Sequence, residues 1–115
     1  MRVYVATTPE AIKELLGGSA TFEDYLTPEQ FEFDAGADEE EREHLVSLLA
    51  ADDSLELNQG KVGLVIAAEL NEEQINGQAI TISFKQVAAL LHSTDGEELS
   101  WFAPEEIEHQ IGGLF

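Results

Sequence analysis

The chain contains no cysteine, which removes several kinds of chemistry at once. Without thiols there is no disulfide framework, no thiolate nucleophile and no sulfur ligand for a metal. Basic residues are also scarce, because five Lys and Arg stand against 24 Asp and Glu and the formal net charge is -19. A surface of this charge repels phosphate backbones and anionic lipid, so we expect no nucleic-acid partner and no membrane partner.

Long apolar runs are missing as well. No stretch approaches the roughly 20 apolar residues that a membrane-spanning helix needs, and the start at Met1 enters a strand pattern without the basic and apolar regions of a signal peptide. We therefore expect a cytoplasmic protein. Since 43% of the 115 residues are apolar, we expect one core and a single acidic domain over residues 1–115.

The spacing of apolar residues predicts a series of short elements. All three prolines precede a glutamate in the pattern of a helix start, and an acidic run around Asp38 begins the longest predicted helix, which we expect to end near Ala51 at the polar pair Asp52-Asp53. The predicted helices thus begin near Pro9, Pro28, Asp38 and Pro104. Alternating or continuous apolar runs predict strands over residues 1–5, 21–26, 61–70, 80–84, 86–92 and 99–102.

The element order implies an α/β (α+β) fold, with a single-layer mixed β-sheet of about five strands and helices packed on it. Segment 61–70 is the predicted central strand, because both of its faces are apolar. Segment 86–92 fits a strand by length and a helix by propensity, and we favour the strand. The acidic pair Glu23-Asp24 makes 21–26 an edge strand at best.

Two Glu-x-x-His pairs, Glu41 with His44 and Glu106 with His109, have the spacing found in carboxylate-bridged di-iron sites. Such sites need further glutamates from two more helices of a four-helix bundle, and this chain has too many strands for that fold. Both histidines lie in runs of acidic residues, where a glutamate three residues upstream arises by chance. We expect solvated helix faces here, with no metal and no other cofactor.

His92 lies at the end of a predicted strand, and polar groups at strand ends often bind ligands. Because imidazole titrates near neutral pH, His92 together with Asp95 is a candidate general acid or base. The simpler alternative is a turn opened by Asp95, with His92 bonded to neighbouring backbone. No serine has the G-x-S-x-G setting of a nucleophile elbow, which disfavours a hydrolase.

Apolar residues near the end of the chain are candidates for contact with a partner. Aromatic residues anchor protein interfaces, and a Gly-Gly pair can release a short apolar end. The candidates are Trp101, Phe102, Leu114 and Phe115. The alternative is that these side chains pack on the protein's own core.

Several segments together carry a family resemblance: Met1–Val5, Asp38–Glu43, Val62–Glu69, Val87–His92 and Leu99–Phe102. They resemble a small uncharacterised family of high-GC Gram-positive bacteria, whose members open with an M-R-V-Y-V strand. The resemblance implies an intracellular domain of actinobacterial type and favours the strand over 86–92. It implies no activity, ligand or catalytic residue. Where relatives read His-Val-Asp-Asp, this chain has His92-Ser93-Thr94-Asp95.

Three hypotheses about function follow from these observations. The first is a non-enzymatic cytoplasmic domain that binds another protein, or a second copy as a homo-oligomer, through an apolar strip near Trp101 and the C-terminal tail. The alternative is a small enzyme or metal-dependent protein that uses His92 with Asp95, or a Glu-x-x-His pair. The third, based on net charge alone, is a mimic of an anionic polymer that occupies a basic protein surface.

Overall fold

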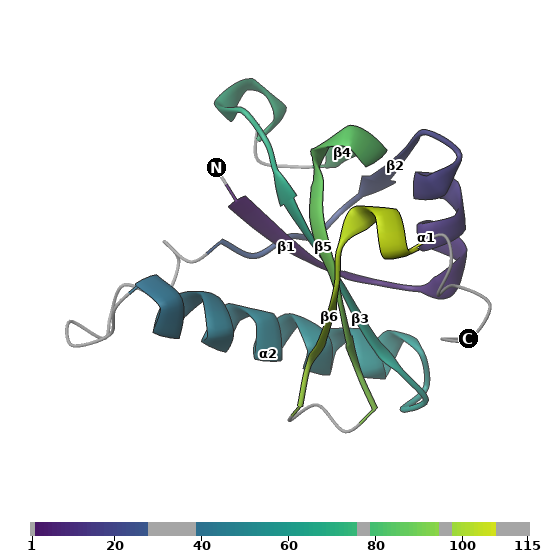
Figure 1. The fold of residues 1–115 in the computed structure, drawn as a ribbon, viewed down its shortest axis with the longest axis vertical. Coiled ribbons are helices and arrows are strands. Elements are labelled where there is room, and N and C mark those ends of the chain that lie inside the picture. Colours follow the sequence, from purple (N-terminus) through teal and green to yellow (C-terminus); the bar gives the residue numbers. More distant parts are fainter. Residues whose placement is uncertain (1, 28–38, 76–78, 95–97, 108–115) are drawn as a thin grey trace.

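The computed structural model describes residues 2–27, 39–75, 79–94 and 98–107. The strands in these ranges form two antiparallel sheets (Figure 1). The larger sheet has the order β1-β3-β5-β6, with bounds Arg2–Thr7, Gly63–Glu69, Val87–Ser93 and Ser100–Phe102. The smaller sheet pairs β2 with β4, with bounds Ser19–Phe22 and Ile80–Ser83.

Among the described residues, the helices α1 and α2 and the short 3-10 helices η2 and η3 accompany the strands. Their bounds are Pro9–Leu16 for α1, Glu39–Leu57 for α2, Glu72–Gln74 for η2 and Phe84–Gln86 for η3. The start of α1 follows from its sequence, because the Ala11 backbone N–H donates to Thr8 Oγ1 at 3.3 Å and Pro9 needs no N–H partner in the first turn. A further helical turn begins at Pro104. Within the described ranges, no helix is both long and apolar enough to cross a membrane.

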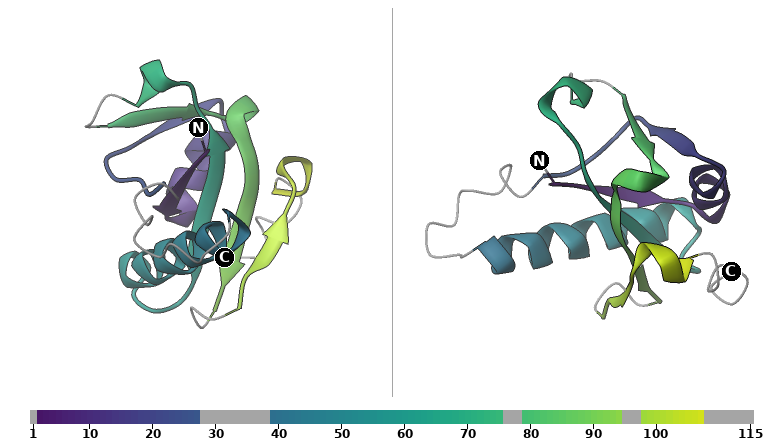
Figure 2. Two further views of the ribbon diagram at one scale, coloured as in Figure 1. Left: turned by 90° about the vertical axis from the view of Figure 1, so that its left-hand side faces the viewer. Right: turned by 45° about the horizontal axis from the view of Figure 1, so that its top comes forward.

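Strand β3 is central, and both faces of the larger sheet are covered. On one face, the α1 side, the sheet packs against α1, the β2–β4 pair and Ile107; the core residues there include Val3, Val5, Leu64, Ile66, Leu90, Ile12, Leu15, Phe22, Ile80 and Ile82. On the other face, the α2 side, α2 lies over the sheet (Figure 2); the core residues there are Tyr4, Val46, Ala50, Ala51, Val65, Ala67 and Ala89. This two-sided burial explains why segment 61–70 is apolar on both of its faces.

The predicted α+β class is confirmed, but the arrangement of the strands differs from the single mixed sheet that we expected. All pairings between the described strands are antiparallel. Strands β2 and β4 form a separate pair, whose apolar residues pack on the α1 side of the larger sheet and share its core. The alternating pattern of β4 was therefore read correctly as a strand, while period-two patterns carry no information about which sheet a strand joins.

Several predicted elements are confirmed, including the strand and helix within residues 1–18, the central strand and the strand over 86–92. The predicted end of α2 near Ala51 is wrong, since the helix continues to Leu57. Asp52 and Asp53 do not break the helix because both are exposed, while Ser54, the next residue, is buried.

Two strand bounds also need correction. Strand β2 covers Ser19–Phe22 and not 21–26, with Leu26 forming one isolated bridge to Tyr4. Phe84 belongs to η3, because β4 ends at Ser83. The helix predicted from Pro28 lies outside the described residues.

Candidate functional site

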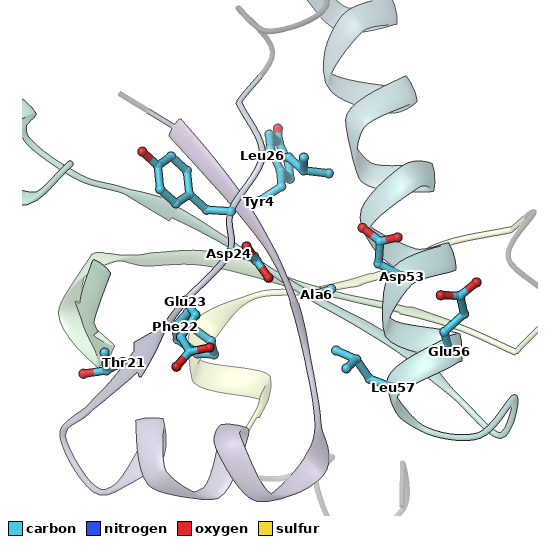
Figure 3. A pocket seen from close by; sticks show the side chains of 11 residues that line it. Tyr4, Ala6, Thr21, Phe22, Glu23, Asp24, Leu26, Asp53, Glu56 and Leu57 are labelled. Carbon is cyan, nitrogen blue, oxygen red and sulfur yellow. The ribbon is translucent and has the colours of Figure 1, made fainter. Parts of the chain in front are cut away.

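A concave surface lies beside β1, on the α2 side of the larger sheet. It is a hollow of about 740 Å³, within the size range of small-molecule and side-chain binding sites. We call it the acidic hollow; its described lining residues are Tyr4, Ala6, Thr21, Phe22, Glu23, Asp24, Tyr25, Leu26, Asp53, Glu56 and Leu57 (Figure 3).

One wall of the acidic hollow comes from the last turns of α2. Asp53, Glu56 and Leu57 are spaced at i, i+3 and i+4, which places them on one side of the helix. All three are exposed, and Leu57 keeps 59% of its surface accessible. The wall therefore presents two carboxylates above an apolar side chain, as Figure 3 shows.

The opposite wall is the segment that follows β2. Here the chain turns back along β1, and Leu26 exchanges two backbone hydrogen bonds with Tyr4, at 2.8 Å and 2.9 Å. These bonds fix the segment beside the sheet edge and hold Glu23 and Asp24 at the rim, where both are exposed. Acidic side chains thus line the acidic hollow from both walls.

Tyr4 and Ala6 of β1 form the floor between these walls. Tyr4 is 4% exposed and belongs to the core under α2. Burial, followed by the nearby Glu43 carboxylate, raises the pKa of the Tyr4 hydroxyl, so the phenol stays neutral at ordinary pH. The floor is therefore uncharged, and the charge of the acidic hollow resides in its four rim carboxylates, those of Glu23, Asp24, Asp53 and Glu56.

No lysine or arginine is among the described residues that line the acidic hollow. One of the five basic residues, Arg2, instead donates from Nε to Glu69 Oε1 at 2.8 Å, across the β1–β3 pair. The acidic hollow consequently combines an apolar floor with negative charge. A positively charged group with an apolar stem, such as a lysine or arginine side chain, suits both features.

His92 occupies a different region, near the end of β5, where it pairs with Leu64 and with Ser100 of the neighbouring strands. Its side chain is half-buried, and burial lowers its pKa below the usual 6.5. His92 is not among the described residues that line the acidic hollow. Asp95, the predicted partner of His92, lies outside the described residues.

The predicted metal-ligand pairs fall on helix surfaces. Glu41 and His44 are both exposed on α2, and Glu106 is exposed in the helical turn that begins at Pro104. His109 lies outside the described residues. In the part of the chain that the structure describes, no three Asp, Glu or His side chains are grouped so that they could hold a metal ion.

The predicted interaction residues differ from one another in exposure. Trp101 is 60% exposed on the edge strand β6, whereas Phe102 is half-buried and packs against the core on the α1 side. Register explains the difference, because Trp101 pairs with Leu91 and Phe102 with Leu90, and successive strand residues point to opposite faces. Leu114 and Phe115 lie outside the described residues.

Sequence reasoning missed the acidic hollow. Its walls come from segments about thirty residues apart, and Asp53 had been assigned to a break after α2. The only available signal was the i, i+3, i+4 spacing of Asp53, Glu56 and Leu57, which is visible only if the helix continues past Asp52.

Comparison of the chain with protein-family models, with curated proteins and with solved structures finds no match.

Proposed function

We propose that this protein is a non-enzymatic, cytoplasmic protein-interaction domain whose partner is basic. The observation that carries the proposal is the acidic hollow, where carboxylates on two walls surround an uncharged floor and no described lining residue is a cation. Rim charges of this kind accelerate and orient the approach of an oppositely charged partner. The lack of cysteine is compatible with a reducing compartment.

The net charge favours a different protein over a second copy as the partner. Two copies of a chain with a formal charge of -19 repel each other, and the acidic hollow would have to face a surface of the same composition. A protein that presents lysine or arginine side chains gains attraction at long range and ion pairs at contact. Each exposed ion pair contributes up to about 1 kcal/mol, so several are needed.

A charge-matched pair of variants tests this proposal. In Asp53→Asn/Glu56→Gln the acidic hollow loses two carboxylates, whereas Asp52→Asn/Glu14→Gln removes two exposed carboxylates that do not line it. Binding of a fluorescent arginine-rich peptide is measured by anisotropy at low salt, with an uncharged peptide of equal length as a control. We expect about tenfold weaker binding for the first variant, since two lost ion pairs amount to about 1.4 kcal/mol.

The second variant should bind nearly as well as the unaltered protein. Equal losses in both variants would mean that the peptide responds to net charge alone, and the proposed site would be wrong. Binding of the uncharged peptide with equal affinity would also contradict the proposal, because it would show that the carboxylates have no part in recognition.

A further inference from the structure

The two edges of the larger sheet are protected to different degrees. At the β1 edge, Leu26 occupies the outer backbone groups of Tyr4 through two hydrogen bonds. At the other edge, β6 pairs with β5 on its inner side, and no other described strand lies on its outer side (Figure 2). An edge strand offers backbone N–H and C=O groups to which another strand can pair.

The side chains of β6 lack the devices that usually protect an edge. Lysine, proline, bulges and a very short length all discourage pairing of an edge strand with other chains. With the three residues Ser100, Trp101 and Phe102, β6 is short, but it contains no lysine, proline or bulge. Its backbone register to β5 is regular over all three residues. The edge is therefore suited to accept a strand.

Trp101 adds an apolar surface next to this edge. It lies on the α2 side of the sheet, because its pairing partner Leu91 packs against the core under α2, as does Leu99. Helix α2 packs mainly on β3 and β1 and reaches β5 only in part, so it leaves Trp101 60% exposed. A side chain from an added strand could cover this indole.

The charge around β6 identifies the chemistry of the partner. Residues 87–107 contain no lysine or arginine and five acidic residues, of which Glu98, Glu105 and Glu106 are described and exposed. Pairing of β6 with β6 of a second copy would bring these carboxylates together, which like-charge repulsion opposes. An extended segment that carries lysine or arginine meets attraction at the same place.

We infer that β6 is a docking edge for an extended, basic segment of another protein, which adds to the larger sheet as a further strand and covers Trp101. Backbone hydrogen bonds supply part of the affinity, and the indole and the glutamates select apolar and basic side chains. This surface is separate from the acidic hollow, which lies beside the opposite edge strand β1. The inference therefore does not depend on the proposed function.

The single tryptophan of the chain reports directly on this edge. A short peptide that alternates valine and lysine is titrated into the full-length protein, and tryptophan emission is recorded. We expect a shift to shorter wavelength as the peptide covers Trp101. A peptide of the same sequence with every backbone nitrogen methylated keeps the charge but donates no backbone hydrogen bonds, so it should produce no shift.

Matched variants then locate the binding site through the anisotropy of the labelled peptide. Trp101→Ala should weaken binding at least tenfold, whereas Leu45→Ala, which truncates another exposed apolar side chain, and Asp52→Asn/Glu14→Gln should not. Asp53→Asn/Glu56→Gln, at the opposite edge of the sheet, should keep the shift in Trp101 emission. Circular dichroism checks that each variant is folded.

Three results would overturn the inference: no emission shift with the unmethylated peptide, equal binding of the methylated peptide, or a shift caused by raising the protein concentration alone. The last result would assign the edge to a second copy of this chain. Loss of peptide binding in the variant of the acidic hollow, with Trp101→Ala unaffected, would support the proposed function and refute the docking edge.

Discussion

A single hydroxyl group joins three elements at the C-terminal end of α2. Ser54 is fully buried; its Oγ donates to the Thr7 carbonyl oxygen at 2.7 Å and accepts from the Leu64 backbone N–H at 2.7 Å. Asn58 Nδ2 donates to the carbonyl oxygens of Thr7 and Val62, both at 3.1 Å. These bonds fasten the last turns of α2, which carry one wall of the acidic hollow, to β1 and to the start of β3.

Ser54→Ala should lower the free energy of unfolding by about 1–3 kcal/mol, because it leaves a buried N–H and a buried carbonyl with fewer partners. Urea unfolding followed by circular dichroism measures this change. Ser19→Ala is the control, since Ser19 is exposed and its substitution should change stability by less than about 0.5 kcal/mol. Similar losses in the two variants would show that the hydroxyl of Ser54 has no special role.

Residue patterns could not have predicted this role of Ser54. A serine within a polar stretch, Asp52-Asp53-Ser54, resembles the start of a loop, and its partners at Thr7 and Leu64 are distant in the chain. Hydrogen bonds from a side chain to backbone groups of other elements depend on the tertiary structure. By contrast, the Thr8 cap of α1 acts within four residues, so the start of this helix near Pro9 could be predicted.

Sequence patterns within one element predicted helices and strands reliably, whereas features that depend on contacts between distant segments were not predicted. Strand β5 was identified from its length and its apolar run, and burial on both faces was correctly expected for β3. The division of strands between two sheets and the extension of α2 to Leu57 depend on contacts between distant segments. Periodicity indicates which residues are buried, but it does not show which other element covers them.

The packing of α2 on β3 depends on a glycine at the start of the strand. A Cβ at Gly63 would lie 2.8 Å from the Ala51 carbonyl oxygen, a backbone atom that cannot move without shifting the helix. Gly63→Ala should therefore destabilise the fold by about 1–3 kcal/mol, as overpacking of a core does. Thermal unfolding measures the effect.

Gly17→Ala is the control for this substitution. Gly17 follows α1, is exposed and has a right-handed backbone with φ of -77°; a Cβ there would lie 3.3 Å from the Glu14 carbonyl oxygen, so alanine should cost less than at Gly63. If Gly63→Ala were as stable as the unaltered protein, the close approach of α2 to β3 would be incorrect. The wall of the acidic hollow would then need to be placed differently as well.

For the whole molecule, composition predicted the sign of the charge but not its location. The net charge of -19 is evident from the sequence, yet the acidic hollow forms only when residues near 24 and near 56 meet beside β1. Likewise, Trp101 was a predicted contact residue, but its position on the edge strand β6 follows from the strand order β1-β3-β5-β6. Candidate sites here arise from topology, and topology cannot be inferred from the residue pattern of one sequence.

The net charge also leads to a prediction about salt. Repulsion among the carboxylates opposes the compact state, and its range falls from about 30 Å at 0.01 M salt to about 8 Å at 0.15 M. The melting temperature should therefore rise between about 10 mM and about 150 mM sodium chloride. Attraction between the acidic hollow and an arginine-rich peptide is screened by the same ions, so its affinity should fall over this range.

These two responses have opposite signs, which makes the salt titration informative. If folding and binding both weakened with salt, repulsion among the acidic side chains would not be a significant term in stability. If both strengthened, peptide binding would be hydrophobic and the four rim carboxylates would have no part in it. Only a more stable protein that binds the peptide less tightly agrees with carboxylates that repel one another in the free protein and attract a basic partner.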